Sequence, residues 1–494
     1  MQQGLPAQRK EKEMNLTCNN SKNSSNIRWF ILADILLGTF MATLDSSIVN
    51  VALPTISTQL NVTLSIVQWI VVSYLLAIAS LLPIFGRLAD MWGRSKVYSI
   101  GFLVFTLGSV LCGLCNAIGM LVGMRVLQAV GASMMMATNQ AIIVSSFPVS
   151  ERGRALGLLG TFVALGSLTG PALGGFLVSW VGWRYIFYVN VPIGIIGYLL
   201  AKIVLPADKD KKEVSFDYKG SILFTMSLIG ILFAVNDGNV FGWSSPIILG
   251  SLFLGVILLA VFTLVELRME NPLINFSIYR NRVFMLGNFS AFLNFAATFA
   301  NAILMPFYLQ NVLHYSGFRV GLMMAFLPIC MAITAPLSGY GSDKFGPIWF
   351  ATGGLLFNTL GYLFLLSVTT HSTFWGIIPS LILVGVGTGM FQPPNNSFVM
   401  SSVSKDQIGI VNGLNALIRN LGMIMGASLS VLILERLQAT ILSGIANPTQ
   451  IQMDSSFVEA FHIVMAFLAG ISVCAAIISF SRKNYISLKD GLQE

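Results

Sequence analysis

The sequence predicts an all-α, polytopic membrane protein with 14 transmembrane helices. Of its 494 residues, 55% are hydrophobic and only 10% are charged, whereas a soluble domain carries roughly 25% charged residues. Apolar segments of about 20 residues, long enough to cross a bilayer, recur along the chain. The basic residues gather in the polar segments that would lie on one side of the membrane. Together these three observations define the fold class.

The expected helices follow one another with short polar or glycine-containing segments between them. They span 29–52, 66–86, 97–115, 119–143, 155–178, 185–204, 218–236, 246–266, 283–310, 320–340, 348–368, 375–399, 408–434 and 460–481. Because the number of crossings is even, both termini lie on the same side.

The Lys and Arg residues indicate which side that is. If the N-terminus is cytoplasmic, 23 of the 28 basic residues fall in inner segments, and only Arg184, Arg319 and Arg436 fall in outer ones. Arg125 and Arg419 lie within helices. The positive-inside rule therefore places both termini in the cytoplasm, and we expect a multi-pass protein of a prokaryotic cell membrane. The net charge of +8 is thus a topology signal and not a nucleic-acid-binding patch.

An internal repeat divides the helices into two halves. Residues 253 positions apart match in one motif, and residues 256 positions apart match in another. The first set pairs Gly86, Asp90 and Gly93 with Gly339, Asp343 and Gly346; the second includes Gly131 with Gly387 and Asn139 with Asn395. We expect a cytoplasmic tail (1–28), a six-helix half (29–204), a linker with two inserted helices (205–282), a second six-helix half (283–481) and a cytoplasmic tail (482–494).

A glycine-rich stretch lies inside the fifth helix. Gly166, Gly170 and Gly174 recur every four residues and form a groove in which a second helix can approach closely. Pro171 removes one backbone hydrogen bond and permits a bend, and Gly175 extends the stretch. The alternative is a groove that serves packing alone.

The charged residues within expected membrane helices include two acids and one arginine of the first half, and charge there is costly and indicates function by default. Asp45 is deep in the first helix and is a candidate proton carrier, unless hydroxyl groups such as that of Ser47 simply satisfy it. Asp34, 11 residues earlier, lies about 20° away on the helix wheel and roughly 16 Å lower. We expect it near the inner rim, within reach of water. Arg125 needs a partner or a water-filled cavity.

Polar stripes on three helices of the second half are candidates for the wall of a substrate cavity. Spacings of three, four and seven place the members of each stripe on one helix face. The candidates are Asn294, Asn301 and Tyr308; Gln392 and Asn396; and Asn412, Asn415 and Arg419. The alternative is polar contact between neighbouring helices.

A short inner loop joins the second and third helices and contains Gly86, Asp90, Gly93 and Arg94. Asp90 could cap a helix N-terminus or pair with Arg94 or Arg154. Because exposed ion pairs are individually weak, a gating role for this loop needs support from elsewhere.

Several motifs together resemble a known family. LDSSIVNVALPTI (Leu44–Ile56), QWIVVSYLL (Gln68–Leu76), GRLADMWGRSK (Gly86–Lys96), RVLQAVGA (Arg125–Ala132), GPALGG (Gly170–Gly175) and GWRYIFYVNVPIG (Gly182–Gly194) occur in order. They resemble the fourteen-helix drug:proton antiporters of the major facilitator superfamily over residues 29 to 481. The resemblance implies an acidic site at Asp45, proton handling by Arg125 and a gating contact at the inner loop.

The resemblance also implies a function. Members of that family export hydrophobic, often cationic compounds in exchange for protons, and some carry lipids or fatty acids. No GxxxxGK[ST] loop, HExxH motif or clustered histidines occur, so we expect no enzyme activity, metal or cofactor. The expected partners are a small hydrophobic substrate, protons and the bilayer, with the protein acting as a monomer. The alternatives are a lipid or fatty-acid exporter of the same fold and a membrane receptor that moves no cargo.

Overall fold

The computed structural model describes residues 5–205, 217–269, 276–403, 408–445 and 447–482. Within these ranges the chain is helical without any strand, and 14 helices are long and apolar enough to cross a membrane. The predicted fold class and number of helices are therefore confirmed.

The first group of helices, called here the first bundle, contains α1 to α8. Its helices are α1 (Leu5–Leu60), α2 (Leu64–Val67), α3 (Trp69–Trp92), α4 (Arg94–Leu114), α5 (Ile118–Ser146), α6 (Val149–Trp180), α7 (Tyr185–Tyr188) and α8 (Asn190–Val204). Helices α4 and α5 come close because Gly131 lies against the backbone of Phe105 and Gly101. Small residues allow such contacts where lipid supplies no hydrophobic drive between helices.

The second bundle contains the helices from α11 onward, preceded by the short helix η1 (Phe276–Arg280). Its elements are α11 (Arg282–Phe307), the π-helical turn η2 (Tyr308–Val312), α12 (Gly317–Phe345), α13 (Pro347–Phe364), η3 (Leu365–Ser367), α14 (Phe374–Ser401), α15 (Ile408–Ile441) and α16 (Gln450–Ser481). Glycines again set the closest packing, since Gly426 of α15 lies against the carbonyl of Ala296 in α11.

Several helix ends differ from the sequence prediction, and two of them differ by ten residues or more. Helix α1 begins at Leu5, so the segment expected as a separate tail continues the first membrane helix. Helix α16 begins ten residues before position 460, because Thr449 and Gln452 form a capping box that starts it at Gln450.

The two inserted helices, α9 (Tyr218–Phe241) and α10 (Pro246–Glu266), pack against each other as a hairpin. Helix α9 also contacts α3 of the first bundle and α15 of the second. Gln68 donates a hydrogen bond to Asn236 (3.0 Å), and the indole of Trp69 donates to Asp237 (3.1 Å). The hairpin therefore lies across the seam between the bundles.

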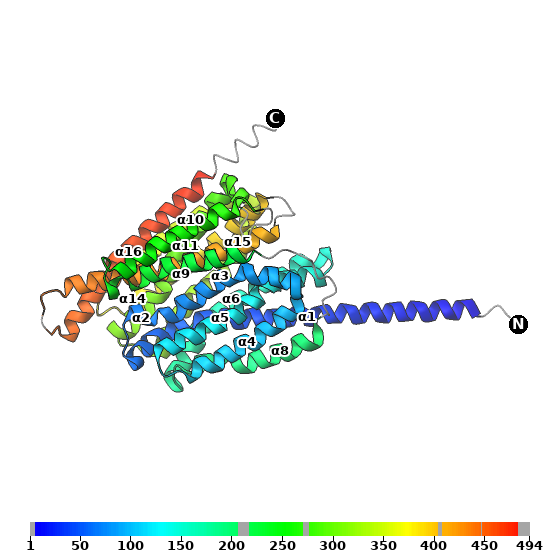
Figure 1. Cartoon of the computed structure of the whole chain (residues 1–494), viewed down its shortest axis with the longest axis horizontal. Coiled ribbons are helices and arrows are strands. Elements are labelled where there is room, and N and C mark those ends of the chain that lie inside the picture. The colour runs from blue at the N-terminus through cyan, green and yellow to red at the C-terminus, as the bar shows by residue number, and fades with distance from the viewer. Residues whose placement is uncertain (1–4, 206–216, 270–275, 404–407, 446, 483–494) are drawn as a thin grey trace, which may run out of the picture.

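The bundles meet at the end away from the termini, called here the far side; the opposite end is the terminal side. Figure 1 shows them close together at the far side and diverging toward the termini. Thr55 of the first bundle donates to Gln310 of the second (3.1 Å), and Ser65 donates from both its backbone N–H (2.8 Å) and its hydroxyl to Glu435. The described structure is therefore closed on the far side.

Candidate functional site

Asp45 and Arg125 form an ion pair inside the first bundle. Arg125 Nη1 lies 2.6 Å from Asp45 Oδ2, and both side chains are fully buried. Two further donors reach the other carboxylate oxygen, Gln128 Nε2 at 2.9 Å and Asn190 Nδ2 at 2.8 Å. Helices α1, α5 and α8 thus converge on one carboxylate.

The guanidinium of Arg125 is held on several sides. Its Nη1 also donates to Gln128 Oε1 (2.6 Å), and its Nε donates to the carbonyl of Ile70 (3.1 Å). The ring of Tyr74 lies 4.0 Å from the guanidinium carbon, a cation–π contact that is strong when desolvated. Its Nη2 finds no hydrogen-bond partner among the described residues. Among the described residues, Asp45 is the anion that pairs with this buried cation.

The sequence analysis identified Asp45 and Arg125 but not the other residues of the network. Asp45 is held by a guanidinium and two amides, whereas the hydroxyl of Ser47 donates to the carbonyls of Leu44 and Gly166. Gln128 and Asn190 were missed, although both stand in motifs that the sequence analysis singled out. An amide beside a membrane arginine, in Arg125–Ala132, was the available signal.

Asp34 is buried, whereas the sequence analysis expected it within reach of water. The side chain is fully buried instead of wetted, and neither carboxylate oxygen has a hydrogen-bond partner in the described part of the chain. Tyr98 of α4 lies close by, since its hydroxyl donates to the backbone carbonyl of Asp34 (3.0 Å).

The glycine groove of α6 faces α1. A Cβ atom at Gly166 would collide with Thr43 Oγ1, one at Gly170 would collide with Ser47 Oγ, and one at Gly174 would lie 2.8 Å from the backbone of Ile48. These contacts are tighter than real Cβ atoms show. The groove therefore forms a close helix pair with the helix that carries Asp45.

The far end of the same helix faces the second bundle. A Cβ at Gly175 would collide with the carbonyl of Gly317 in α12, and one at Gly321 would collide with the carbonyl of Pro171. Helix α6 thus contacts α1 with the face that carries Gly170 and Gly174, and α12 with the face that carries Pro171 and Gly175.

The predicted gating segment is a single-residue turn. Gly93 separates α3 from α4 with φ +106, a backbone conformation that side-chain-bearing residues seldom adopt. Gly86 and Asp90 belong to α3, and Arg94 begins α4. Of the partners considered, Asp90 pairs with Arg94 (2.9 Å), and the side chains stay partly exposed.

The polar stripe on α11 is buried in the described structure. Asn294 accepts a hydrogen bond from Asn358 of α13 (2.8 Å), and Tyr308 donates to the carbonyl of Thr369 (2.6 Å). Asn301 lies on the same helix face and is fully buried. Two members of the stripe thus make contacts inside their own bundle, whereas neither amide atom of Asn301 has a hydrogen-bond partner among the described residues.

The remaining cavity candidates are more accessible. Asn396 on α14 is exposed, and Gln392, Asn415 and Arg419 on α14 and α15 are half-buried. No ion pair to Arg419 occurs among the described residues, and its Nε has no hydrogen-bond partner there. The side chain of Asn412 lies outside the described residues. An accessible cation and three amides thus remain as candidate ligand-binding groups.

Arg482 was expected in a polar tail but is fully buried just beyond α16. It donates to Asn395 (2.7 Å) and to the carbonyl and hydroxyl of Ser479. Burial lowers the pKa of this guanidinium to about 10.

The sequence also matches a protein-family model. Residues 35–427 match the model of the Major Facilitator Superfamily, which is more than half of the chain. The chain belongs to this superfamily. The superfamily match covers both the Asp45–Arg125 pair and the groove of α6.

Similar proteins within the superfamily have different substrates in their names. The riboflavin transporter RibZ of Clostridioides difficile is 35% identical over 81% of this chain and 87% of its own length. The multidrug resistance protein Stp of Mycobacterium tuberculosis is 33% identical over 79% of this chain and 73% of its own. A solved structure of a bacterial homologue of the lysosomal transporter Spinster, inward-facing and occupied, shares the fold (TM-score 0.67, 17% identity, 92% of this chain and 97% of that one).

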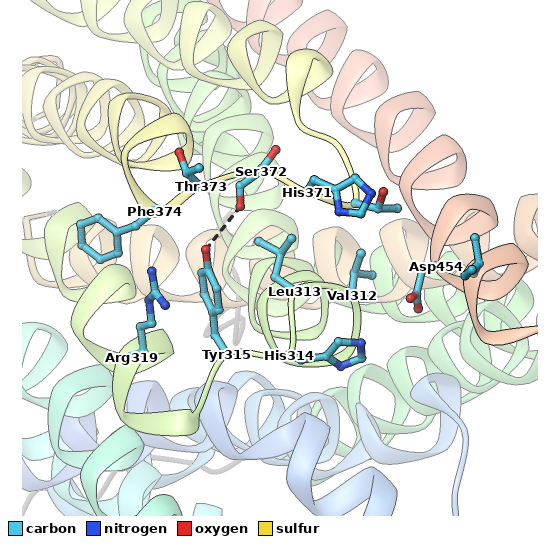
Figure 2. Close-up of a pocket in the computed structure, with 12 residues that line it drawn as sticks. Val312, Leu313, His314, Tyr315, Arg319, His371, Ser372, Thr373, Phe374 and Asp454 are labelled. Atoms are coloured by element: carbon cyan, nitrogen blue, oxygen red, sulfur yellow. Dashed lines mark hydrogen bonds between the residues drawn. The ribbon is translucent and has the colours of Figure 1, made fainter.

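A hollow of about 570 Å³ lies on the far side of the second bundle. Figure 2 shows Tyr315 donating to the carbonyl of Ser372 there, with Arg319, His371 and Asp454 around it. It contains none of the predicted site residues. In this superfamily member the hollow is therefore separate from the Asp45–Arg125 pair.

Proposed function

We propose that this protein is a proton-coupled exporter of small hydrophobic compounds. The observation that carries the proposal is the buried Asp45–Arg125 pair, because an ionisable pair within the membrane is costly and indicates an ion pathway by default. With Asp34 it forms the proposed proton-coupling group. One charge moving across 100 mV supplies roughly 2.3 kcal/mol, about a fiftyfold substrate gradient.

Alternating access follows from the packing of the two bundles. Repeat-related halves that move against each other expose a central site to one side at a time. The closed far side, held by Gln310 and Glu435, is one end of that cycle. With both termini in the cytoplasm, as the basic residues indicate, this structure is the inward-facing state.

Two substrate classes are supported. Similarity to the multidrug resistance protein Stp favours hydrophobic cations such as ethidium. Similarity to the riboflavin transporter RibZ favours a polar heterocycle. Arg419, which has no ion-pair partner among the described residues, and the half-buried amides of Gln392 and Asn415 suit that class better. Lipid export and cargo-free binding are the remaining outcomes.

Proteoliposomes that carry a pH gradient test the proposal. Ethidium and riboflavin are offered separately, and their flux is recorded together with internal pH. We expect at least one compound to move against its gradient and the pH gradient to fall in step. Flux that ignores the pH gradient contradicts proton coupling, and binding without flux identifies a receptor.

The topology is tested with single cysteines in a background without the five native ones. Arg268→Cys lies just beyond α10 on the terminal side, and Ser443→Cys lies just beyond α15 on the far side; both positions are exposed. We expect an impermeant thiol reagent to label position 443 in intact cells and position 268 only after lysis. Labelling of 268 in intact cells contradicts the orientation.

Closure of the far side can be locked by a disulfide between α6 and α12. A Cβ at Gly317 would lie 3.1 Å from Ser179 Oγ, a separation that suits a disulfide. In the variant Ser179→Cys/Gly317→Cys we expect oxidation to stop transport and reduction to restore it. The two single variants are controls. Full transport by the oxidised, cross-linked protein contradicts alternating access.

A further inference from the structure

The two acidic residues of α1 are in opposite environments. Asp45 receives three donors, one of them a guanidinium. Asp34 is equally buried but has no donor to either carboxylate oxygen among the described residues. When the environments of two carboxylates differ in this way, the difference assigns the ionised role to one and the neutral role to the other.

No ion pair to Asp34 occurs among the described residues. Arg28 pairs with Glu151 (3.1 Å) and Arg94 with Asp90 (2.9 Å), while the Lys202 ammonium lies 5.0 Å from the Tyr198 ring.

The elements that cover Asp34 also leave it without a partner. Tyr98 of α4 is the titratable residue that faces it, and its hydroxyl is directed to the backbone carbonyl. On α5, Asn139 donates to Thr39 of α1 (2.9 Å). An isolated ionised carboxylate is costly to bury, and such a group neutralises instead.

The position of Asp34 suits proton release. It precedes Asp45 by 11 residues, so it lies roughly 16 Å nearer the terminal side along α1, where the bundles diverge (Figure 1). Asn139 of α5 bonds Thr39, five residues further along α1 than Asp34, and its Oδ1 has no hydrogen-bond partner among the described residues. Polar groups therefore continue from Asp34 toward the interior.

We propose that Asp34 carries the coupled proton in this state, as a neutral carboxylic acid, while Asp45 stays ionised against Arg125. On release the O–H bond breaks, the electron pair stays on the Asp34 carboxylate, and the proton passes to water on the terminal side. This inference rests on the proposed proton-coupled export and adds which acid is the carrier.

Infrared difference spectroscopy on the purified full-length protein tests the inference without any substrate. At neutral pH we expect the wild type to show a carboxylic-acid C=O band that shifts in D2O. The band should be lost in Asp34→Asn and retained in Asp45→Asn. The difference spectrum is the wild-type spectrum minus that of Asp34→Asn. If it shows bands of an ionised carboxylate, the inference is overturned.

A second variant provides a test in case Asp34→Asn does not fold. Asp34→Glu keeps the acid, so it should retain a carboxylic-acid band at a shifted frequency. Absence of that band in folded Asp34→Glu overturns the inference as well.

Transport separates this inference from the proposed function. In proteoliposomes with ethidium or riboflavin, Asp34→Asn should lose pH-gradient-driven flux while exchange between equal substrate pools continues. If the wild type moves neither compound with protons, the proposed function fails and the infrared result still assigns the neutral acid. If Asp34→Asn couples with the wild-type pH profile, the carrier assignment is wrong.

Discussion

Replacing Asp45 by Asn should stop transport and lower the free energy of unfolding by about 3–5 kcal/mol, the usual cost of breaking a buried ion pair. The substitution leaves the Arg125 guanidinium buried without its anion, and its Nη2 already has no hydrogen-bond partner within the described ranges. Unfolding in detergent, followed by tryptophan fluorescence, measures the loss.

A double variant separates stability from function. In Asp45→Leu/Arg125→Met both charges are gone, so most of the stability should return, because apolar replacement of a buried pair is often neutral or stabilising. Transport should stay absent, since no ion pair remains. Restored transport in the double variant would mean that the pair serves folding alone.

An exposed ion pair of the same bundle is the matched control. Asp90 and Arg94 keep about a third of their side-chain surface accessible, and exposed pairs contribute roughly 0–1 kcal/mol. Asp90→Asn should therefore change stability far less than Asp45→Asn. Equal losses from both variants would contradict the assignment of the stability effect to burial.

The number of helices and the two charged residues Asp45 and Arg125 could be predicted, because each depends on local chemistry. A run of 20 apolar residues crosses a bilayer whatever surrounds it. Likewise, a buried carboxylate and a buried guanidinium each need a partner. Asp45 and Arg125 were each identified on that ground, and the structure adds that they are each other's partner.

The errors share one physical origin. Periodicity states which way a side chain points from its own helix axis, and it says nothing about the neighbouring helix. The side chain of Asp34 is fully buried, and Tyr98 of α4 is bonded to its backbone carbonyl, whereas an aqueous rim was expected. Asn294 accepts a hydrogen bond from Asn358 of α13, a contact between two helices that the polar stripe alone did not identify. Both features depend on tertiary packing, which periodicity does not describe.

Replacing Gly170 by Ala should reduce transport at least tenfold although it adds a single methyl group. The new Cβ would occupy the position of Ser47 Oγ and would lie 3.0 Å from the backbone nitrogen of Ile48. Helix α6 must then move away from α1, and overpacking of this kind costs about 1–3 kcal/mol. Efflux of a transported compound, normalised to the amount of protein in the membrane, measures the effect.

The same helix supplies the matched control. Nothing lies within 4 Å of a Cβ at Gly160, so Gly160→Ala makes the same chemical change ten residues away without a collision and should transport normally. The variant Gly170→Ala/Ser47→Gly removes the colliding hydroxyl and its Cβ, so part of the activity should return. If Gly160→Ala is as damaging as Gly170→Ala, the loss comes from altered helix flexibility and not from the close contact with α1.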